Sequence, residues 1–154
     1  MDDKDIVLTP QGFANLTEEL DRLIAIERPQ IIRQMNEARA MGDLRENAAY
    51  HAAREKQAMI QGRILEIQHT LKYAKISERS GDKDMVEIGS TVTVLVNGDE
   101  KEFSIVGEQE SDIMLGKISV QSPIGSLLIG KRMGESVEVE MPQGVVTYKI
   151  VNLK

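Results

Sequence analysis

The sequence has no cysteine, no tryptophan and few aromatic side chains of any kind. Without cysteine, the chain can form neither a disulfide framework nor a thiolate site. With only three tyrosines and two phenylalanines, an aromatic ligand pocket and a base-stacking platform are both disfavoured. No apolar run has the length of a membrane span, and the acidic residues 1–5 lack the features of a signal peptide. We therefore expect a cytoplasmic protein without a membrane partner.

Acidic residues are in excess, and the formal net charge of −6 argues against a general nucleic-acid binder. Most of this excess lies after residue 76. Residues 22–63 instead carry eight basic and five acidic side chains. A mildly basic segment suits an approach toward RNA or the acidic rim of a channel. A solvated helix face with ion pairs between successive turns explains the same charge and, on charge alone, is the stronger explanation.

The first half of the chain has the hydrophobic period of helices. Thr9-Pro10 predicts an N-cap followed by proline at the first helical position. The apolar stripe then slips across Pro29, which lacks a backbone donor and should bend or loosen the helix. A second stripe follows on a return arm: Ile60, Ile64, Ile67, Leu71 and Ala74, extended toward the turn by Ala49 and Ala53. Two such stripes predict an antiparallel coiled-coil hairpin over residues 1–76.

After a polar, glycine-containing linker expected at residues 77–84, the hydrophobic period changes to two. Asn97-Gly98 predicts a tight turn after a strand at Thr91–Val96. Ser122-Pro123 should open one short helix that Gly130 closes. Further strands are expected at Glu102–Val106, Ile113–Leu115, Lys117–Val120, Ser136–Met141 and Val145–Leu153. The prediction is an α+β protein whose residues 85–154 form a small, mostly antiparallel β domain.

Residues 42–47, Gly-Asp-Leu-Arg-Glu-Asn, interrupt the helical pattern where the hairpin should turn. If the return helix begins at Leu44, Asp43 is its N-cap and Glu46 its third residue, which is a capping box. On spacing alone, this structural explanation is the stronger one. The functional alternative is metal binding, because Mg²⁺ typically takes one or two carboxylates plus water and phosphate oxygens. Two acids on a protruding tip can complete a site that already holds a metal and a phosphodiester.

The run from Gly42 to Glu55 closely resembles the tip signature of the Gre transcript-cleavage factors. The similarity covers nearly the whole chain, through residues 8–20, 27–32, 107–113, 116–125 and 128–131. This resemblance implies a coiled coil that enters the secondary channel of bacterial RNA polymerase. It also implies a globular domain with an FKBP-like fold that docks at the channel rim.

For individual residues, the resemblance implies that Asp43 and Glu46 hold a Mg²⁺ ion jointly with the polymerase. They would position the attacking water at the 3′ end of backtracked RNA, so that the polymerase cleaves its own transcript and arrested complexes are rescued. Asn47 and Tyr50 would support the tip, and Ser122 and Pro123 lie in the docking segment. We expect a monomer that is no nuclease by itself and holds no tightly bound cofactor when free.

Three other functions fit parts of the sequence. A non-catalytic inhibitor that binds the polymerase channel would share the two-domain plan, but the intact Asp-x-x-Glu pair argues against it. A prolyl isomerase would need an aromatic-lined pocket, for which residues 85–154 offer only Phe103 and Tyr148. A coiled-coil adaptor explains the helices and leaves the motif match unexplained. His51 and His69 lie far apart and are not expected to form a metal pair.

Overall fold

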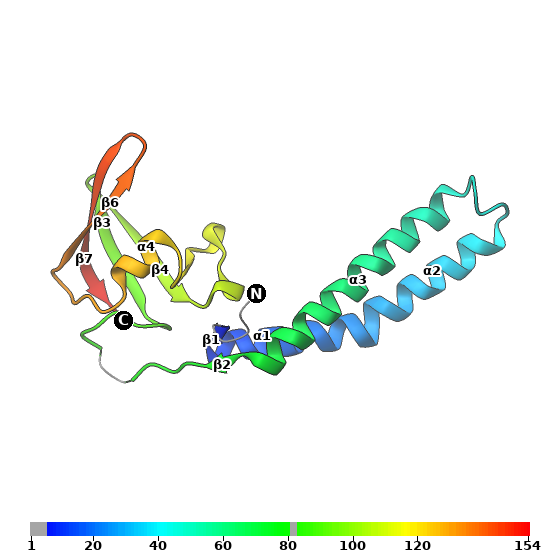
Figure 1. The fold of residues 1–154 in the computed structure, drawn as a ribbon, viewed down its shortest axis with the longest axis horizontal. Coiled ribbons are helices and arrows are strands. Elements are labelled where there is room, and N and C mark those ends of the chain that lie inside the picture. The colour runs from blue at the N-terminus through cyan, green and yellow to red at the C-terminus, as the bar shows by residue number, and fades with distance from the viewer. Residues whose placement is uncertain (1–5, 81–82) are drawn as a thin grey trace. The chain divides into compact units, whose positions relative to one another are not determined.

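The computed structural model describes residues 6–80 and 83–154, which fall into two compact units (Figure 1). One unit is the helical hairpin, Phe13–Tyr73, and the other combines the residues up to Gly12 with Ala74–Lys154. Of the predicted linker, residues 77–80 have no helix or strand, and residues 81–82 lie outside the described residues. Among the residues described, none of the helices has the length and hydropathy of a membrane span.

The outgoing arm of the hairpin consists of α1 (Pro10–Arg22), a π-helical segment η2 (Leu23–Glu27) and α2 (Arg28–Ala40). Thr9 Oγ1 accepts a hydrogen bond from Gly12 N–H at 3.0 Å, which confirms Thr9 as the N-cap of α1. Pro29 has no N–H to donate to the carbonyl one turn earlier. The helix widens just before it, and Arg28 N–H donates to the Leu23 carbonyl five residues back. The predicted loosening at Pro29 is thereby confirmed.

The return arm is α3 (Ala48–Tyr73), which lies beside α2 and joins it through a short loop (Figure 1). Ile60, Ile64 and Ile67 are buried against the outgoing arm, as predicted. Ala49 is exposed, however, and the neighbouring Tyr50 is buried instead. Five of the buried positions of α3 follow a heptad spacing: Tyr50, Ala53, Ile60, Ile64 and Ile67. Thr70, which is also buried, lies one residue before the next heptad position. The predicted antiparallel seam is present, and at its end near the loop the buried residue is Tyr50 where Ala49 was predicted.

The second unit contains a five-stranded sheet in the order β5-β4-β3-β7-β6. All neighbours are antiparallel except β4 and β5, which pair in parallel. The strands are β3 (Thr91–Val96), β4 (Asp99–Val106), β5 (Lys117–Ser119), β6 (Ser136–Met141) and β7 (Gly144–Leu153). Together with the short helix α4 (Pro123–Leu128), these strands confirm the predicted α+β class with a mostly antiparallel β domain.

Local turn residues set the boundaries of this sheet. Asn97 and Gly98 both have positive φ, 51° and 82°, and form the predicted turn between β3 and β4. Ser122 accepts a hydrogen bond from Gly125 N–H at 3.0 Å and caps α4, while Gly130 follows the helix with φ of 81°. The core between sheet and helix includes Val92, Ile105, Leu128 and Ile150, all fully buried.

Two further features differ from the sequence-based prediction. Ile113–Leu115 is a 3₁₀ turn, η4, and not a strand. Asp112 starts this turn by accepting a hydrogen bond from Met114 N–H at 3.0 Å, and Gly116, with φ of 72°, ends it. The second difference is a pair of short parallel strands that the sequence analysis did not predict, β1 (Val7–Leu8) and β2 (Lys75–Ile76).

Candidate functional site

The loop between α2 and α3 carries both acids singled out in the sequence. The return helix begins at Ala48, so the predicted capping box of Asp43 and Glu46 is wrong. Asn47 is the N-cap instead, because its Oδ1 accepts a hydrogen bond from Tyr50 N–H at 3.0 Å. Asp43 Oδ1 accepts from Arg45 N–H at 3.0 Å, which is a turn within the loop. Both acids are exposed to solvent and are therefore available to a partner.

Side chains join the two arms at the neck of this loop, which consists of Ala38 and Arg39 on α2 and of Asn47 and Tyr50 at the start of α3. Asn47 Nδ2 donates a hydrogen bond to the carbonyl of Ala38 in the last turn of α2. Directly beside it, the Arg39 guanidinium lies 5.7 Å from the centre of the Tyr50 ring, within range of a cation–π contact. Tyr50 is only 9% exposed. The structure thus brings Asn47 and Tyr50 together where the loop that carries Asp43 and Glu46 meets α3.

The donor atoms at the tip suit a divalent cation but do not complete a site. Carboxylate oxygens are ligands that Mg²⁺ accepts, usually with water and phosphate oxygens in the remaining positions. Across residues 6–80 and 83–154, no group of three or more His, Cys, Asp or Glu side chains could hold a metal. His51 and His69 each pack against a nearby tyrosine, with ring centroids 5.8 Å and 4.8 Å apart. The tip therefore carries two exposed carboxylates, and the described residues contain no complete metal site around them.

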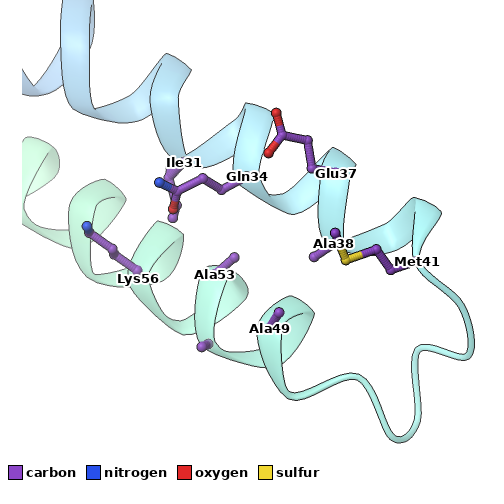
Figure 2. Close-up of a pocket in the computed structure, with 9 residues that line it drawn as sticks. Ile31, Gln34, Glu37, Ala38, Met41, Ala49, Ala53 and Lys56 are labelled. Atoms are coloured by element: carbon purple, nitrogen blue, oxygen red, sulfur yellow. The ribbon is translucent and has the colours of Figure 1, made fainter.

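A shallow groove of about 360 Å³ runs between the arms just below the tip (Figure 2). Ala38, Ala49 and Ala53 form part of its wall, and Met41 lies at its loop end. Because alanine side chains fill little volume, the hairpin is slender here and leaves some apolar surface between the helices. Three polar residues, Gln34, Glu37 and Lys56, also line the groove.

In the second unit, Ser122 and Pro123 line a larger cavity of about 690 Å³. Ser122 Oγ donates to the Ser119 carbonyl at 2.7 Å, which fixes the start of α4 against β5. Phe103, Ile113 and Met141 contribute apolar surface to the same cavity. Ile113, Met114 and Leu115 are 87%, 93% and 68% exposed, so the turn η4 presents three large apolar side chains to solvent.

Sequence analysis missed this apolar turn. The run Ile113–Leu115 looked like a strand, in which alternate side chains would be buried. The signal that reveals a turn is the flanking pair, Asp112 and Gly116, because Asp starts turns and Gly tolerates the left-handed conformation. Exposed apolar side chains beside a cavity are typical of an interaction surface.

Comparison with known proteins covers both units. The family model "Transcription elongation factor, N-terminal" matches residues 6–76. The model "Transcription elongation factor, GreA/GreB, C-term" matches residues 81–154. Together the two models span nearly the whole chain.

Individual relatives agree with this match. Transcription elongation factor GreA of Thermodesulfovibrio yellowstonii is 49% identical over 151 residues, which are 96% of each chain. Transcription elongation factor GreA of Pelobacter propionicus is 47% identical over 97% of this chain and 96% of its own. Among solved structures, GreA factor homolog 1 (Gfh1) of Thermus thermophilus matches with a TM-score of 0.45 and 25% identity, over 97% of this chain and 99% of that one.

Proposed function

Because the chain belongs to the GreA/GreB family of transcription elongation factors, we propose that its hairpin tip completes the active site of RNA polymerase. The hairpin would enter the secondary channel of a backtracked bacterial polymerase and reach the extruded 3′ end of the RNA. The polymerase would then cleave its transcript internally and resume synthesis. In this proposal the factor is no nuclease by itself and acts as a monomer in the cytoplasm.

Asp43 and Glu46 carry the chemical part of the proposal. Their carboxylates would contribute ligands to a Mg²⁺ ion that the polymerase also holds. When bound, that ion activates water and neutralises charge during in-line attack on a phosphodiester. The two side chains extend from a loop, where their position relative to the polymerase depends on how firmly the loop is held. Asn47 and Tyr50 would provide that support at the neck.

One observation carries this proposal: two exposed acids stand in the loop of a slender hairpin, and within the described part of the chain they belong to no group of three or more metal-binding side chains. Two carboxylates at a solvated position make a poor cage for Mg²⁺ alone. They are well suited to complete a site whose remaining ligands belong to another molecule. Basic side chains on the distal hairpin, among them Arg39, Arg54 and Lys56, would favour its approach to a negatively charged channel or RNA.

The second unit would provide docking at the channel rim. Ser122 and Pro123 lie beside the cavity that Ile113 and Phe103 also line. Exposed apolar side chains of the turn η4 would become buried on docking and supply affinity. In this proposal the β domain contributes most of the affinity for the polymerase, and the hairpin tip assists RNA cleavage.

The test is a transcript-cleavage assay on backtracked elongation complexes. Asp43→Ala and Glu46→Ala should each reduce stimulated cleavage by a factor of about 100 or more, because a metal ligand is lost, while affinity for the polymerase is largely kept. Asp21→Ala is the matched control, since it removes an exposed acid from α1 far from the loop in sequence. The factor with RNA and Mg²⁺, but without polymerase, should release no fragments.

Full cleavage by the Asp43→Ala, Glu46→Ala double variant would refute the catalytic role of the tip. Slowed synthesis with intact RNA, in complexes given the unmodified factor, would instead indicate a channel-binding inhibitor. Both results come from the same gel, because shortened RNA and stalled full-length RNA migrate differently.

A further inference from the structure

The side-chain amide of Asn47 makes two hydrogen bonds that reach different arms of the hairpin. Its Oδ1 accepts from Tyr50 N–H at 3.0 Å, at the start of α3. Its Nδ2 donates to the carbonyl of Ala38, in the last turn of α2. The residues between Ala38 and Asn47 include both acids, so one side chain closes the neck of the loop that presents them.

We propose that Asn47 is the positioning residue of the tip and that the two ends of its amide have separable roles. The acceptor end starts α3. The donor end holds the loop against α2, so that the carboxylates of Asp43 and Glu46 are presented in one arrangement. This inference rests on the proposed function, because the arrangement of the acids matters for cleavage only if they share a metal with the polymerase.

Helix capping by itself does not require an amide at position 47. Asp and Ser cap helices about as well as Asn, and both supply the acceptor that Tyr50 N–H needs. The Ala38 carbonyl is one of the last four of α2, which have no partner in their own helix. It accepts from Met41 N–H at 3.1 Å and, with its second lone pair, from Asn47. Asn provides both the cap and this donor.

The acids themselves cannot be relied on to hold the loop. Asp43 Oδ1 is engaged by Arg45 N–H at 3.0 Å, which stabilises the turn from within. A metal bound through Oδ1 would compete with this hydrogen bond, whereas one bound through Oδ2 would not. The bond from Asn47 to Ala38 supports the loop without using either acid. The contact between Arg39 and Tyr50 strengthens the neck on the α3 side.

Misplaced ligands are costly in a shared site. Groups that orient metal ligands typically change metal affinity or activity by about 10- to 100-fold when they are removed. A displacement of about 1 Å at the reacting centre has a similar cost. Loss of the donor end of Asn47 should therefore lower cleavage without lowering affinity for the polymerase, which depends mainly on the other unit.

The experiment compares Asn47→Asp, which keeps the capping oxygen and loses the donor, with Asn47→Ser, which shortens the side chain but can still cap. Asn36→Asp is the matched control, because it makes the same change in charge at an exposed position of α2. Each variant is titrated against backtracked complexes at several Mg²⁺ concentrations. The saturating cleavage rate should fall about tenfold and the Mg²⁺ requirement should rise several-fold in both Asn47 variants. The half-saturating factor concentration should stay within about twofold, because docking is unchanged.

A second readout needs neither polymerase nor metal. Backbone order parameters from NMR relaxation of the free protein should fall below about 0.6 for residues 42–46 in both Asn47 variants. The body of α3 should remain near 0.85. Asn36→Asp should leave both regions unchanged.

Three results would overturn the inference. Cleavage rates and Mg²⁺ dependence like those of the unmodified protein would show that Asn47 positions nothing. A loss of activity with an unchanged Mg²⁺ requirement and a raised half-saturating concentration would assign Asn47 to docking. Unchanged order parameters in the loop would show that the neck does not hold it. If Asp43→Ala kept full activity in the same assay, the proposed function would fail first, and this inference with it.

Discussion

Arg63 and Glu19 form a bidentate ion pair between the arms of the hairpin. Arg63 Nε lies 2.7 Å from Glu19 Oε1, and Nη2 lies 2.9 Å from Oε2. Arg63 also donates to Glu66 Oε2 at 3.1 Å, one turn along α3. The hydrogen bond from Arg63 lowers the pKa of Glu19 more than its partial burial raises it. The same bond raises the pKa of Arg63, so the guanidinium stays charged at any ordinary pH.

Arg63→Lys should destabilise the hairpin although it preserves charge. A lysine ammonium cannot donate two parallel bonds to one carboxylate. Because both side chains remain partly exposed, 38% and 28%, we expect a loss of about 1 kcal/mol in the free energy of unfolding. Urea unfolding followed by circular dichroism measures this change. Arg54→Lys, at an exposed position of the same helix, should change the stability by less than about 0.5 kcal/mol.

The contribution of Glu19 should depend on pH in a defined direction. Its pKa is lower in the folded than in the unfolded chain, so the unfolded chain binds the proton more readily. The stabilisation is therefore complete above the unfolded pKa of about 4.3 and is lost as pH falls through the folded value. The difference in unfolding free energy between the protein and Glu19→Gln should be constant from about pH 6 to 8 and shrink below about pH 4.5. A difference that persists undiminished at pH 3 would contradict this account.

Gly62→Ala should stabilise the hairpin. Gly62 lies inside α3, and a Cβ built on it would meet no atom within 4 Å beyond the adjacent residues and backbone of its own helix. Alanine there restricts the unfolded chain and improves helix propensity, which should add about 0.5–1 kcal/mol. The midpoint of urea unfolding should rise without a change in slope. Gly42→Ala provides the contrast, because φ of 141° in the loop disfavours any side chain. A loss of stability in Gly62→Ala would mean that the glycine has a role that packing does not explain.

Substitutions in the turn η4 should weaken docking and leave catalysis intact. Ile113→Ser and Met114→Ser alter side chains that are 87% and 93% exposed, so folding stability should change little. If the polymerase buries these side chains, the half-saturating factor concentration in the cleavage assay should rise about tenfold for each. The cleavage rate at saturation should not change. Met59→Ser, at a 75% exposed position of α3, is the control for removing an exposed methionine.

Features decided by neighbouring residues could be predicted from the sequence. Thr9-Pro10 and Asn97-Gly98 specify a helix start and a tight turn through their own backbone preferences. The stripe of Ile60, Ile64 and Ile67 predicted the seam because burial of one helix face repeats with the helical period. These signals need no knowledge of the rest of the chain.

Features decided by distant residues could not be predicted. Asp43 and Asn47 are both good capping residues, and the donor bond from Asn47 to Ala38 in the other arm favours the second. The strands Val7–Leu8 and Lys75–Ile76 are short, and the whole hairpin lies between them in the sequence. Their pattern is too brief to distinguish a strand from a loop, so only the folded arrangement reveals them.

The heptad seam has a consequence for the length of the hairpin. Buried positions of α3 repeat every seven residues, and on α2 Ile31 and Ala38 keep the same interval. An insertion or deletion of one heptad in each arm would therefore conserve every facing pair while moving the tip by about 10 Å. Changes of any other size would rotate one stripe away from the other. The distance from the base of the hairpin to Asp43 and Glu46 can therefore change only by whole heptads if the buried seam is to be conserved.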